Sequence, residues 1–257
     1  MCLVVAALHA HPRYALVVAA NRDEYHARPA AAAAWGSDGG FQGVLAGRDL
    51  AAGGTWLGVT RDGRVALVTN VRDGKAQDPA APSRGALVPR LLASPLDEAI
   101  AALAQDGARY NGFNLLAGNA SSLRWMSNRG GAPRRIDAGV HGLSNALLDV
   151  PWPKVVRTRE RMLEWIAAGE TDVEPLFAAL ADRNRAADSE LPHTGVALEW
   201  ERILSSPFIV TERYGTRCST IYTIDTTGRG EFRERSFAAD GTLSGEVVET
   251  FRLEARP

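Results

Sequence analysis

Cys2 is the residue in this 257-residue chain best suited to nucleophilic chemistry. Removal of an initiator methionine is favoured when the next residue is small, and it would leave Cys2 with a free α-amine beside its own thiol. An α-amine has a pKa of roughly 8, so part of it is neutral near pH 7 and accepts a proton. Nucleophile and base would then lie in one residue, as in N-terminal nucleophiles. The alternative is a small buried residue at a strand start, because free cysteines are among the most buried residues.

Two apolar runs follow this cysteine and would position it. Residues 3–8 and 14–20 are apolar, and the polar segment 9–13 separates them. This pattern predicts a β-hairpin of two buried strands. Because the open ends of a hairpin lie side by side, we expect Cys2 beside the residues that follow the second run.

Those residues form a polar group, Asn21-Arg22-Asp23-Glu24. A nearby guanidinium stabilises a thiolate, so Arg22 would activate Cys2. Asp23 or Glu24 would hold the ammonium group or orient Arg22. The sequence therefore predicts a nucleophile with its charge-setting partners at one end of the hairpin.

Three more residues with suitable chemistry stand at predicted strand ends. Asn70 ends the apolar segment 64–72 and can give a side-chain N–H to an oxyanion, although Asp73-Gly74 just beyond it favours a plain turn. Asn145 ends a short strand. Arg217 follows a turn and suits an anion or an amide oxygen, and the alternative for it is a surface arginine.

The whole-chain composition limits the classes of function. A formal net charge of -1 gives no argument for binding nucleic acid or an acidic membrane. The two cysteines, Cys2 and Cys218, make neither a disulfide framework nor a zinc site. The apolar start lacks a basic region and polar residues interrupt it, so we expect no signal peptide and no membrane span. We expect a cytoplasmic protein with no metal, no cofactor and no integral membrane association.

The rest of the chain mixes helices with short strands. Residues 28–54 are rich in glycine and alanine and are predicted to be loop. Helices are expected over residues 84–106, with a kink or division at Pro89 and a second piece that starts at Ser94-Pro95, and over residues 154–168 and 172–186. Strands are expected over residues 56–58, 64–72, 110–118, 123–126, 141–146, 208–211, 218–224, 231–237 and 246–253. Antiparallel strands covered by helices predict an α+β protein, and we expect a single domain over residues 1–257.

At Asn21-Arg22-Asp23-Glu24 the chain resembles the NRDE family, the family of transport and Golgi organisation protein 2. The likeness extends over nearly the whole chain, in blocks that include Gly47-Arg48-Asp49, residues 53–58, Thr69-Asn70, Ser83-Arg84-Gly85, residues 110–114, residues 142–145, Trp152-Pro153-Lys154 and residues 214–217. This resemblance implies roles that run from lipid and acyl-CoA metabolism to haem handling and Golgi organisation.

The plan is also similar to that of the cysteine-type N-terminal nucleophile hydrolases, which include penicillin V acylase and the bile salt hydrolases. This second resemblance implies a four-layer αββα sandwich. It also implies a catalytic set, which in this sequence matches Cys2, Arg22, Asp23, Asn70, Asn145 and Arg217. The local order differs, because those hydrolases read Arg-Asn-x-Asp where this chain reads Asn-Arg-Asp-Glu.

Together these patterns predict an amidohydrolase that cleaves a non-peptide C–N bond in a small N-acyl or acyl substrate. The alternative is a non-catalytic protein on the same fold that binds haem, acyl-CoA or lipid, or a factor in secretion. The histidines available to iron are His9, His11, His26, His141 and His193. None stands in a recognised ligand spacing, so each is predicted to be a turn or surface residue.

Overall fold

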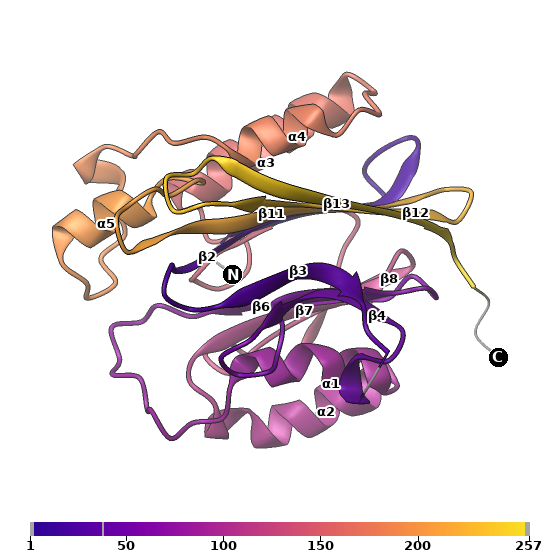
Figure 1. The fold of residues 1–257 in the computed structure, drawn as a ribbon, viewed down its shortest axis with the longest axis horizontal. Helices are drawn as coiled ribbons and strands as arrows, with labels where there is room; N and C mark the ends of the chain where they lie inside the picture. The colour runs from indigo at the N-terminus through magenta and orange to yellow at the C-terminus, as the bar shows by residue number, and fades with distance from the viewer. Residues whose placement is uncertain (1–2, 38, 255–257) are drawn as a thin grey trace.

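The computed structural model describes residues 3–37 and 39–254. Two antiparallel sheets pack face to face, and helices cover the outer face of each (Figure 1). The predicted α+β class and four-layer αββα order are confirmed. The prediction for Cys2 lies outside the described residues.

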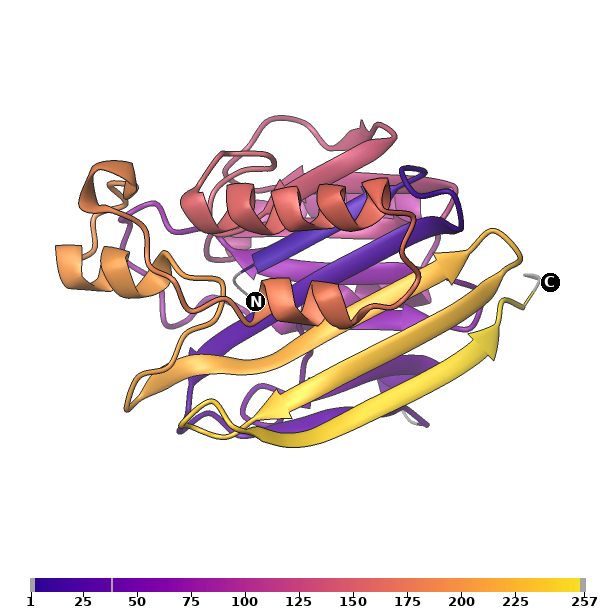
Figure 2. The ribbon, with the colours of Figure 1, turned by 90° about the horizontal axis from the view of Figure 1, so that it is seen from above.

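The first sheet carries the hairpin and has the strand order β10-β1-β2-β11-β12-β13. Its strands are β1 (Leu3–Leu8), β2 (Tyr14–Tyr25), β10 (Gly139–Leu143), β11 (Tyr214–Asp225), β12 (Arg229–Phe237) and β13 (Leu243–Arg252). The helices α3 (Pro153–Ala167) and α4 (Glu174–Leu180) lie side by side over this sheet (Figure 2). The short helix α5 (Leu198–Leu204) lies at its edge (Figure 1).

The second sheet has the order β3-β4-β5-β6-β7-β8-β9. Its strands are β3 (Ala30–Trp35), β4 (Val44–Asp49), β5 (Leu57–Thr60), β6 (Val65–Asn70), β7 (Phe113–Asn119), β8 (Ser122–Ser127) and β9 (Arg134–Ile136). The helices α1 (Leu87–Ala93) and α2 (Leu96–Asp106) cover its outer face (Figure 1).

The layered order explains why β1 and β2 are almost wholly apolar. Alternate residues of a strand point to opposite faces. In β1 one set of side chains (Leu3, Val5, Ala7) packs under α3 and α4, and the other set (Val4, Ala6, Leu8) packs against the second sheet. A strand buried on both faces needs apolar side chains at every position, so the polar end of β2 stands out.

The prediction of a loop over residues 28–54 was wrong in part, because β3 and β4 lie within it. Alanine is a poor strand former by propensity, and pairing with β4 overrides that preference. The predicted hairpin is confirmed, but its second strand was predicted too short. The second strand continues through the polar group to Tyr25, because β11 pairs with it along its whole length.

Three other predicted elements need correction, and two observed elements were not predicted. Pro89 does not break its helix, because it lies in the first turn of α1, where its missing N–H would have no helical partner. The second helix begins after Ser94-Pro95, as predicted. The predicted helix 172–186 ends at Leu180 as α4, and the predicted strand 208–211 is only an isolated bridge at Val210. The short elements β9 and α5 were not predicted.

Candidate functional site

Arg22 lies near the end of β2 and extends into the space between the two sheets. The residue is only 4% exposed. Its Cζ atom lies 4.4 Å from the ring centroid of Trp56, which immediately precedes β5 in the second sheet. A guanidinium over an indole face is attracted by the ring quadrupole. The stack therefore fixes a buried cation between the sheets.

Asn21 faces the helical layer instead and has a structural part. Its Nδ2 atom donates to the carbonyl oxygens of Leu180 (2.8 Å) and Pro207 (2.9 Å). Its Oδ1 atom accepts a hydrogen bond from Ser219 Oγ at 2.6 Å. These hydrogen bonds connect the end of α4 and the segment before β11 to β2. The sequence analysis did not predict this structural role.

Asp23 is buried and held by β11. Its Oδ1 atom accepts a 2.7 Å hydrogen bond from Thr216 Oγ1. The Thr216 Oγ1 atom in turn accepts the backbone N–H of Ile209 at 2.9 Å. Because neighbouring strand residues point to opposite faces, Arg22 and Asp23 serve different sides of the sheet.

Arg217 occupies an irregular position in β11. Thr216 pairs with Asp23 and Cys218 pairs with Arg22, so Arg217 is an extra residue in the ladder. Such a bulge redirects a side chain and is frequent beside active sites. The bulge brings Arg217 and Cys218 to the same cavity wall, close to Arg22.

The Arg217 side chain is anchored from one end. Its Nη1 atom donates to the backbone oxygens of Tyr25 (3.3 Å) and His26 (3.1 Å), just beyond the polar end of β2. The guanidinium is thus held beside β2 rather than extended into solvent.

Asn70 and Asn145 lie next to each other. The Asn145 Nδ2 atom donates to the backbone oxygen of Asn70 at 3.0 Å. The backbone N–H of Arg72 donates to the backbone oxygen of Asn145 at 2.8 Å. One amide hydrogen of Asn145 is therefore used to join the loop after β10 to the end of β6.

A cavity of about 440 Å³, here called the front cavity, is lined by both Arg22 and Asn70. Segment 77–85 forms much of its wall. Its charged lining residues are Arg22, Arg28, Arg84, Glu24, Asp49 and Asp78. Of the predicted site residues, the structure brings Arg22 and Asn70 to this cavity, whereas Asp23, Asn145 and Arg217 do not line it.

Glu234 is a buried acid that the sequence analysis missed. It lies on β12 and is 1% exposed. Its Oε1 atom accepts the backbone N–H of Ala33 at 2.8 Å, and Oε2 accepts Thr220 Oγ1 at 3.2 Å. Burial raises the pKa of this carboxyl. The sequence did hold one indication of this burial. Glu234 lies two residues after Phe232 in the same strand, so the two side chains share the apolar face.

His11 and His26 each form a hydrogen bond with a backbone oxygen of a segment distant in the sequence. A ring nitrogen of His11 lies 2.9 Å from the oxygen of Glu170, and one of His26 lies 3.0 Å from that of Thr211. Among residues 3–37 and 39–254, no group of three or more His, Cys, Asp or Glu side chains is placed to hold a metal ion.

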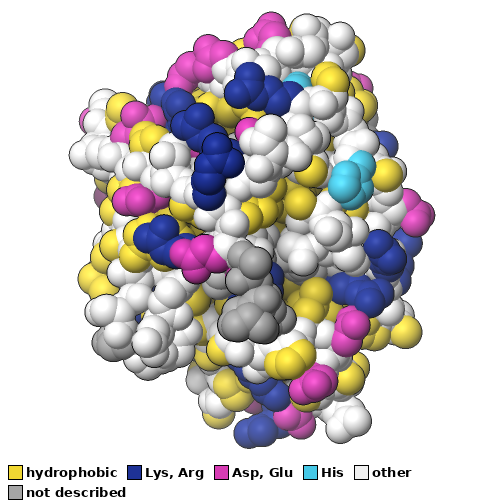
Figure 3. Space-filling model, turned by 90° about the vertical axis from the view of Figure 1, so that its right-hand side faces the viewer, with side chains coloured by type: hydrophobic (Ala, Val, Ile, Leu, Met, Phe, Trp, Pro, Cys, Tyr) yellow, Lys and Arg dark blue, Asp and Glu magenta, His cyan; other side chains and the backbone are white. Residues whose placement is uncertain are grey.

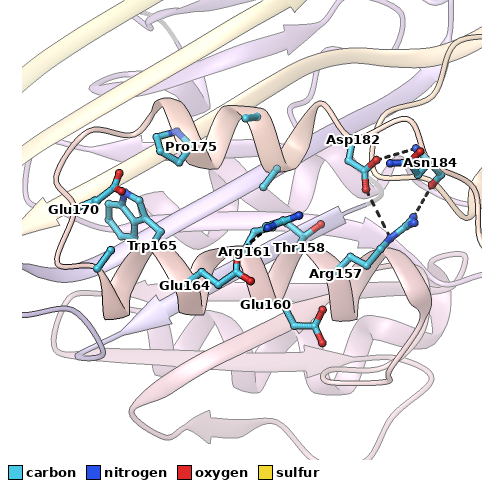
Figure 4. A pocket seen from close by; sticks show the side chains of 13 residues that line it. Arg157, Thr158, Glu160, Arg161, Glu164, Trp165, Glu170, Pro175, Asp182 and Asn184 are labelled. Atoms are coloured by element: carbon cyan, nitrogen blue, oxygen red, sulfur yellow. Dashed lines mark hydrogen bonds and ion pairs between the residues drawn. The ribbon is translucent and has the colours of Figure 1, made fainter.

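A cavity larger than the front cavity lies elsewhere. It measures about 940 Å³ and runs between α3 and α4 on the outer face of the first sheet (Figure 4). An ion pair between Arg157 and Asp182 closes one end, with 3.7 Å between Nε and Oδ2. None of the predicted site residues lines this groove, so size alone does not locate the chemistry.

Two surface features bear on partners. Every helix in the described part of the chain is too short or too polar to cross a lipid bilayer. On the face that Figure 3 displays, basic and acidic side chains are interspersed rather than gathered by sign.

Comparison of the sequence with known proteins identifies its family. The family model described as Transport and Golgi organisation 2 matches residues 1–239. The chain belongs to this family. A Transport and Golgi organization protein 2 homolog of Bos taurus is 34% identical, over 99% of this chain and 100% of the relative. The Homo sapiens homolog is 33% identical, over 98% of this chain and 99% of the relative.

Among solved structures, this member of the Transport and Golgi organisation 2 family is similar to a Caenorhabditis elegans N-acylethanolamine-hydrolyzing acid amidase ortholog. The TM-score is 0.50 at 11% identity, over 86% of this chain and 92% of the other. At this identity the likeness establishes the fold alone. The resemblance to N-terminal nucleophile hydrolases is thereby confirmed at the level of architecture.

Proposed function

We propose that this protein is an N-terminal nucleophile amidohydrolase that uses Cys2 to cleave the C–N bond of a small N-acyl compound. The observation that carries the proposal is the meeting of Arg22, from β2 in the first sheet, and Asn70, from β6 in the second, at one cavity of about 440 Å³. A buried cation and an amide group beside a cavity are the partners that a nucleophilic thiol requires.

The described start of β1 supports a nucleophile at this place. Leu3 pairs with Asn21, the residue before Arg22. Cys2 directly precedes Leu3 in the sequence, so the proposal assigns the reaction to this end of the hairpin. The fold shared with an amidase is consistent with this assignment.

In the proposed reaction, the α-amine of Cys2 takes the thiol proton while the sulfur attacks the substrate carbonyl. Asn70 and Asn145 hold the oxyanion, and one such donor contributes about 3 kcal/mol. The C–N bond then breaks as the ammonium returns its proton to the leaving amine. Water, activated by the same amine, cleaves the thioester and releases the acid.

Three residues set the charge state of this site in the proposal. Arg22 stabilises the thiolate, Asp23 orients the ammonium group, and Arg217 adds a second cation near Arg22. The alternatives expected from the sequence, a binder of haem or acyl-CoA and a secretion factor, have no specific structural observation in their favour. A cytoplasmic location stays a prediction.

The test is the intact mass of the purified full-length protein before and after reaction with an acyl-transfer probe such as a p-nitrophenyl ester. We expect a mass that lacks Met1 and a single added acyl group. Cys2→Ser should abolish the addition, whereas Cys218→Ser should retain it because burial raises the pKa of the Cys218 thiol and keeps it unreactive. Retained Met1, or labelling that persists in Cys2→Ser, would overturn the proposal.

A further inference from the structure

A second, smaller cavity shares the Arg22–Trp56 stack as a wall with the front cavity. It measures about 160 Å³. We call it the rear chamber and define it by Arg22, Trp56, Arg217, Cys218 and Glu234, all of which line it. The mechanism proposed above uses Arg22 and Arg217 to set charge, but it assigns no ligand to this chamber.

The rear chamber gathers hydrogen-bond donors. Three buried nitrogen atoms on its lining residues have no hydrogen-bond partner within the described chain: Nη1 of Arg22, Nε1 of Trp56 and Nε of Arg217. Buried polar atoms in folded proteins are normally paired. The residues that line this small chamber thus carry unpaired buried donors and two guanidinium groups, a lining that suits a ligand rich in acceptor oxygens.

The charge of the lining points the same way. Arg22 and Arg217 are cations, and Glu234 is the one acid among the lining residues found in the described chain. Both Glu234 oxygens already accept hydrogen bonds, from Ala33 N–H and Thr220 Oγ1. The cations therefore outnumber the anions in either protonation state of Glu234, and a negatively charged ligand is favoured.

The size of the chamber limits what enters it. At about 160 Å³ it is several times the roughly 30 Å³ that one water occupies in the liquid. It accommodates a small polar group, whereas the front cavity, at about 440 Å³, has room for a larger part of a substrate. Arg22 and Trp56 border both spaces, so the two cavities adjoin at this pair.

We propose that the rear chamber binds a carboxylate on the amine part of the substrate, so that the substrates are N-acylated amino acids or similar N-acyl compounds with an acidic leaving amine. A carboxylate and a guanidinium form paired, charge-assisted hydrogen bonds. Arg217 is the specificity-determining residue. This inference rests on the proposed function, and its test measures binding rather than turnover.

The test uses full-length Cys2→Ala protein, which cannot be acylated, and isothermal titration with three probes. N-octanoylglycine carries the carboxylate on the amine part, N-octanoylethanolamine is its neutral match, and octanoate carries the carboxylate on the acyl part. We expect N-octanoylglycine to bind about tenfold more tightly than either comparator, a ratio typical of one added charge-assisted contact.

Variants then locate the preference. Arg217→Gln should abolish the advantage of N-octanoylglycine, and Arg217→Lys should keep part of it because the charge remains without the planar fork. Arg124→Gln removes the same charge from β8, where Arg124 pairs with Asp97 of α2, and should leave the advantage unchanged. Far-ultraviolet circular dichroism of each variant verifies folding. If Arg217→Gln does not fold, the binding advantage of N-octanoylglycine is measured in Arg217→Lys, where it should be reduced.

Equal binding of the glycine and ethanolamine conjugates would overturn the inference, as would an advantage that survives in Arg217→Gln. Octanoate binding as tightly as N-octanoylglycine would also overturn it, because the carboxylate would then be that of the acyl part. Acylation of wild-type Cys2 without any carboxylate preference would remove this inference alone. Carboxylate binding without Cys2 acylation would remove the proposed function alone.

Discussion

Gly47 of β4 lies so close to Trp56 that a Cβ atom added at position 47 would stand 2.3 Å from Cζ2 of the indole. The same indole carries the guanidinium of Arg22 on its face, 4.4 Å from the ring centroid. The position of Arg22, a proposed catalytic cation, therefore depends on glycine at position 47 of the other sheet, because any larger residue would displace Trp56.

Gly47→Ala should displace the Trp56 ring and weaken its stack on Arg22. We expect the free energy of unfolding to fall by about 1–3 kcal/mol, the usual cost of overpacking, and acylation of Cys2 to slow. Urea unfolding and the rate of probe labelling measure the two effects. Gly245→Ala is the matched control, because a Cβ at Gly245 meets no atom within 4 Å. Equal behaviour of the two variants would contradict the expectation.

Asn145→Ala should affect both stability and chemistry. The change leaves the Asn70 carbonyl oxygen without the donor that now lies 3.0 Å away. We expect a loss of about 1–3 kcal/mol in stability, and a fall in acylation rate of about 10²-fold or more for the loss of an oxyanion donor. Stopped-flow acylation and urea unfolding separate the two.

The control for this variant is Asn119→Ala. Asn119 Oδ1 accepts the backbone N–H groups of Ser121 and Ser122 in the turn after β7, far along the chain from the candidate site. Its loss should cost stability without slowing acylation. A similar small change in acylation for both variants would mean that Asn145 only positions the loop.

The parts of the site that could be predicted from sequence are those that a single strand carries. The apolar run before Arg22 and the one before Asn70 each end abruptly in polar residues, and a strand buried on both faces makes such an ending visible. The pairing of β1 with β2 followed from the short polar segment between two apolar runs.

Other parts depend on contacts between distant segments. The redirection of Arg217 comes from a bulge against β2, nearly two hundred residues earlier, and no local pattern announces it. Glu234 is buried because β12 packs over β3, where the backbone N–H of Ala33 donates to it. Its sequence neighbours Arg233 and Arg235 are charged, so the local sequence is typical of an exposed strand and does not indicate this burial. Trp56 likewise meets a residue distant in the sequence, because it packs on the guanidinium of Arg22.

His141 and Asp149 provide a test of pH dependence near the Asn145 loop. Their side chains lie 2.8 Å apart, and Asp149 Oδ1 also accepts the backbone N–H of Gly142. The hydrogen bond that His141 donates to Asp149 raises the pKa of His141 above its ordinary 6.5, although burial and Arg159 oppose the charged form. Because the folded pKa is raised, this stabilisation is fully present below about pH 6.5 and is lost as pH rises through the folded pKa.

We therefore expect His141→Gln to lower the free energy of unfolding more at pH 6 than at pH 9. The difference should be about 1 kcal/mol or less, because both side chains are partly exposed. Urea unfolding of wild type and variant at both pH values measures it. A penalty that stays constant, or that grows toward high pH, would show that the charged pair does not close the loop.

Arg72 and Glu201 form a buried ion pair between the end of β6 and α5. Arg72 Nη2 lies 3.0 Å from Glu201 Oε2, and the two side chains are 14% and 4% exposed. Glu201 Oε1 also accepts the backbone N–H of Thr194 at 2.8 Å and its hydroxyl at 2.6 Å. Removing the Arg72 guanidinium would leave the buried Glu201 carboxylate without its cationic partner.

Arg72→Met should therefore lower the free energy of unfolding by about 3–5 kcal/mol. In a Glu201→Gln background the same change should cost much less, because a neutral amide needs no cation and still meets Thr194. Arg161→Met is the control, since its partner Glu164 is exposed and such pairs contribute at most about 1 kcal/mol. If Arg72→Met cost the same in both backgrounds, Arg72 would act by packing on Trp152, whose ring centroid lies 4.8 Å from its guanidinium, and not through Glu201.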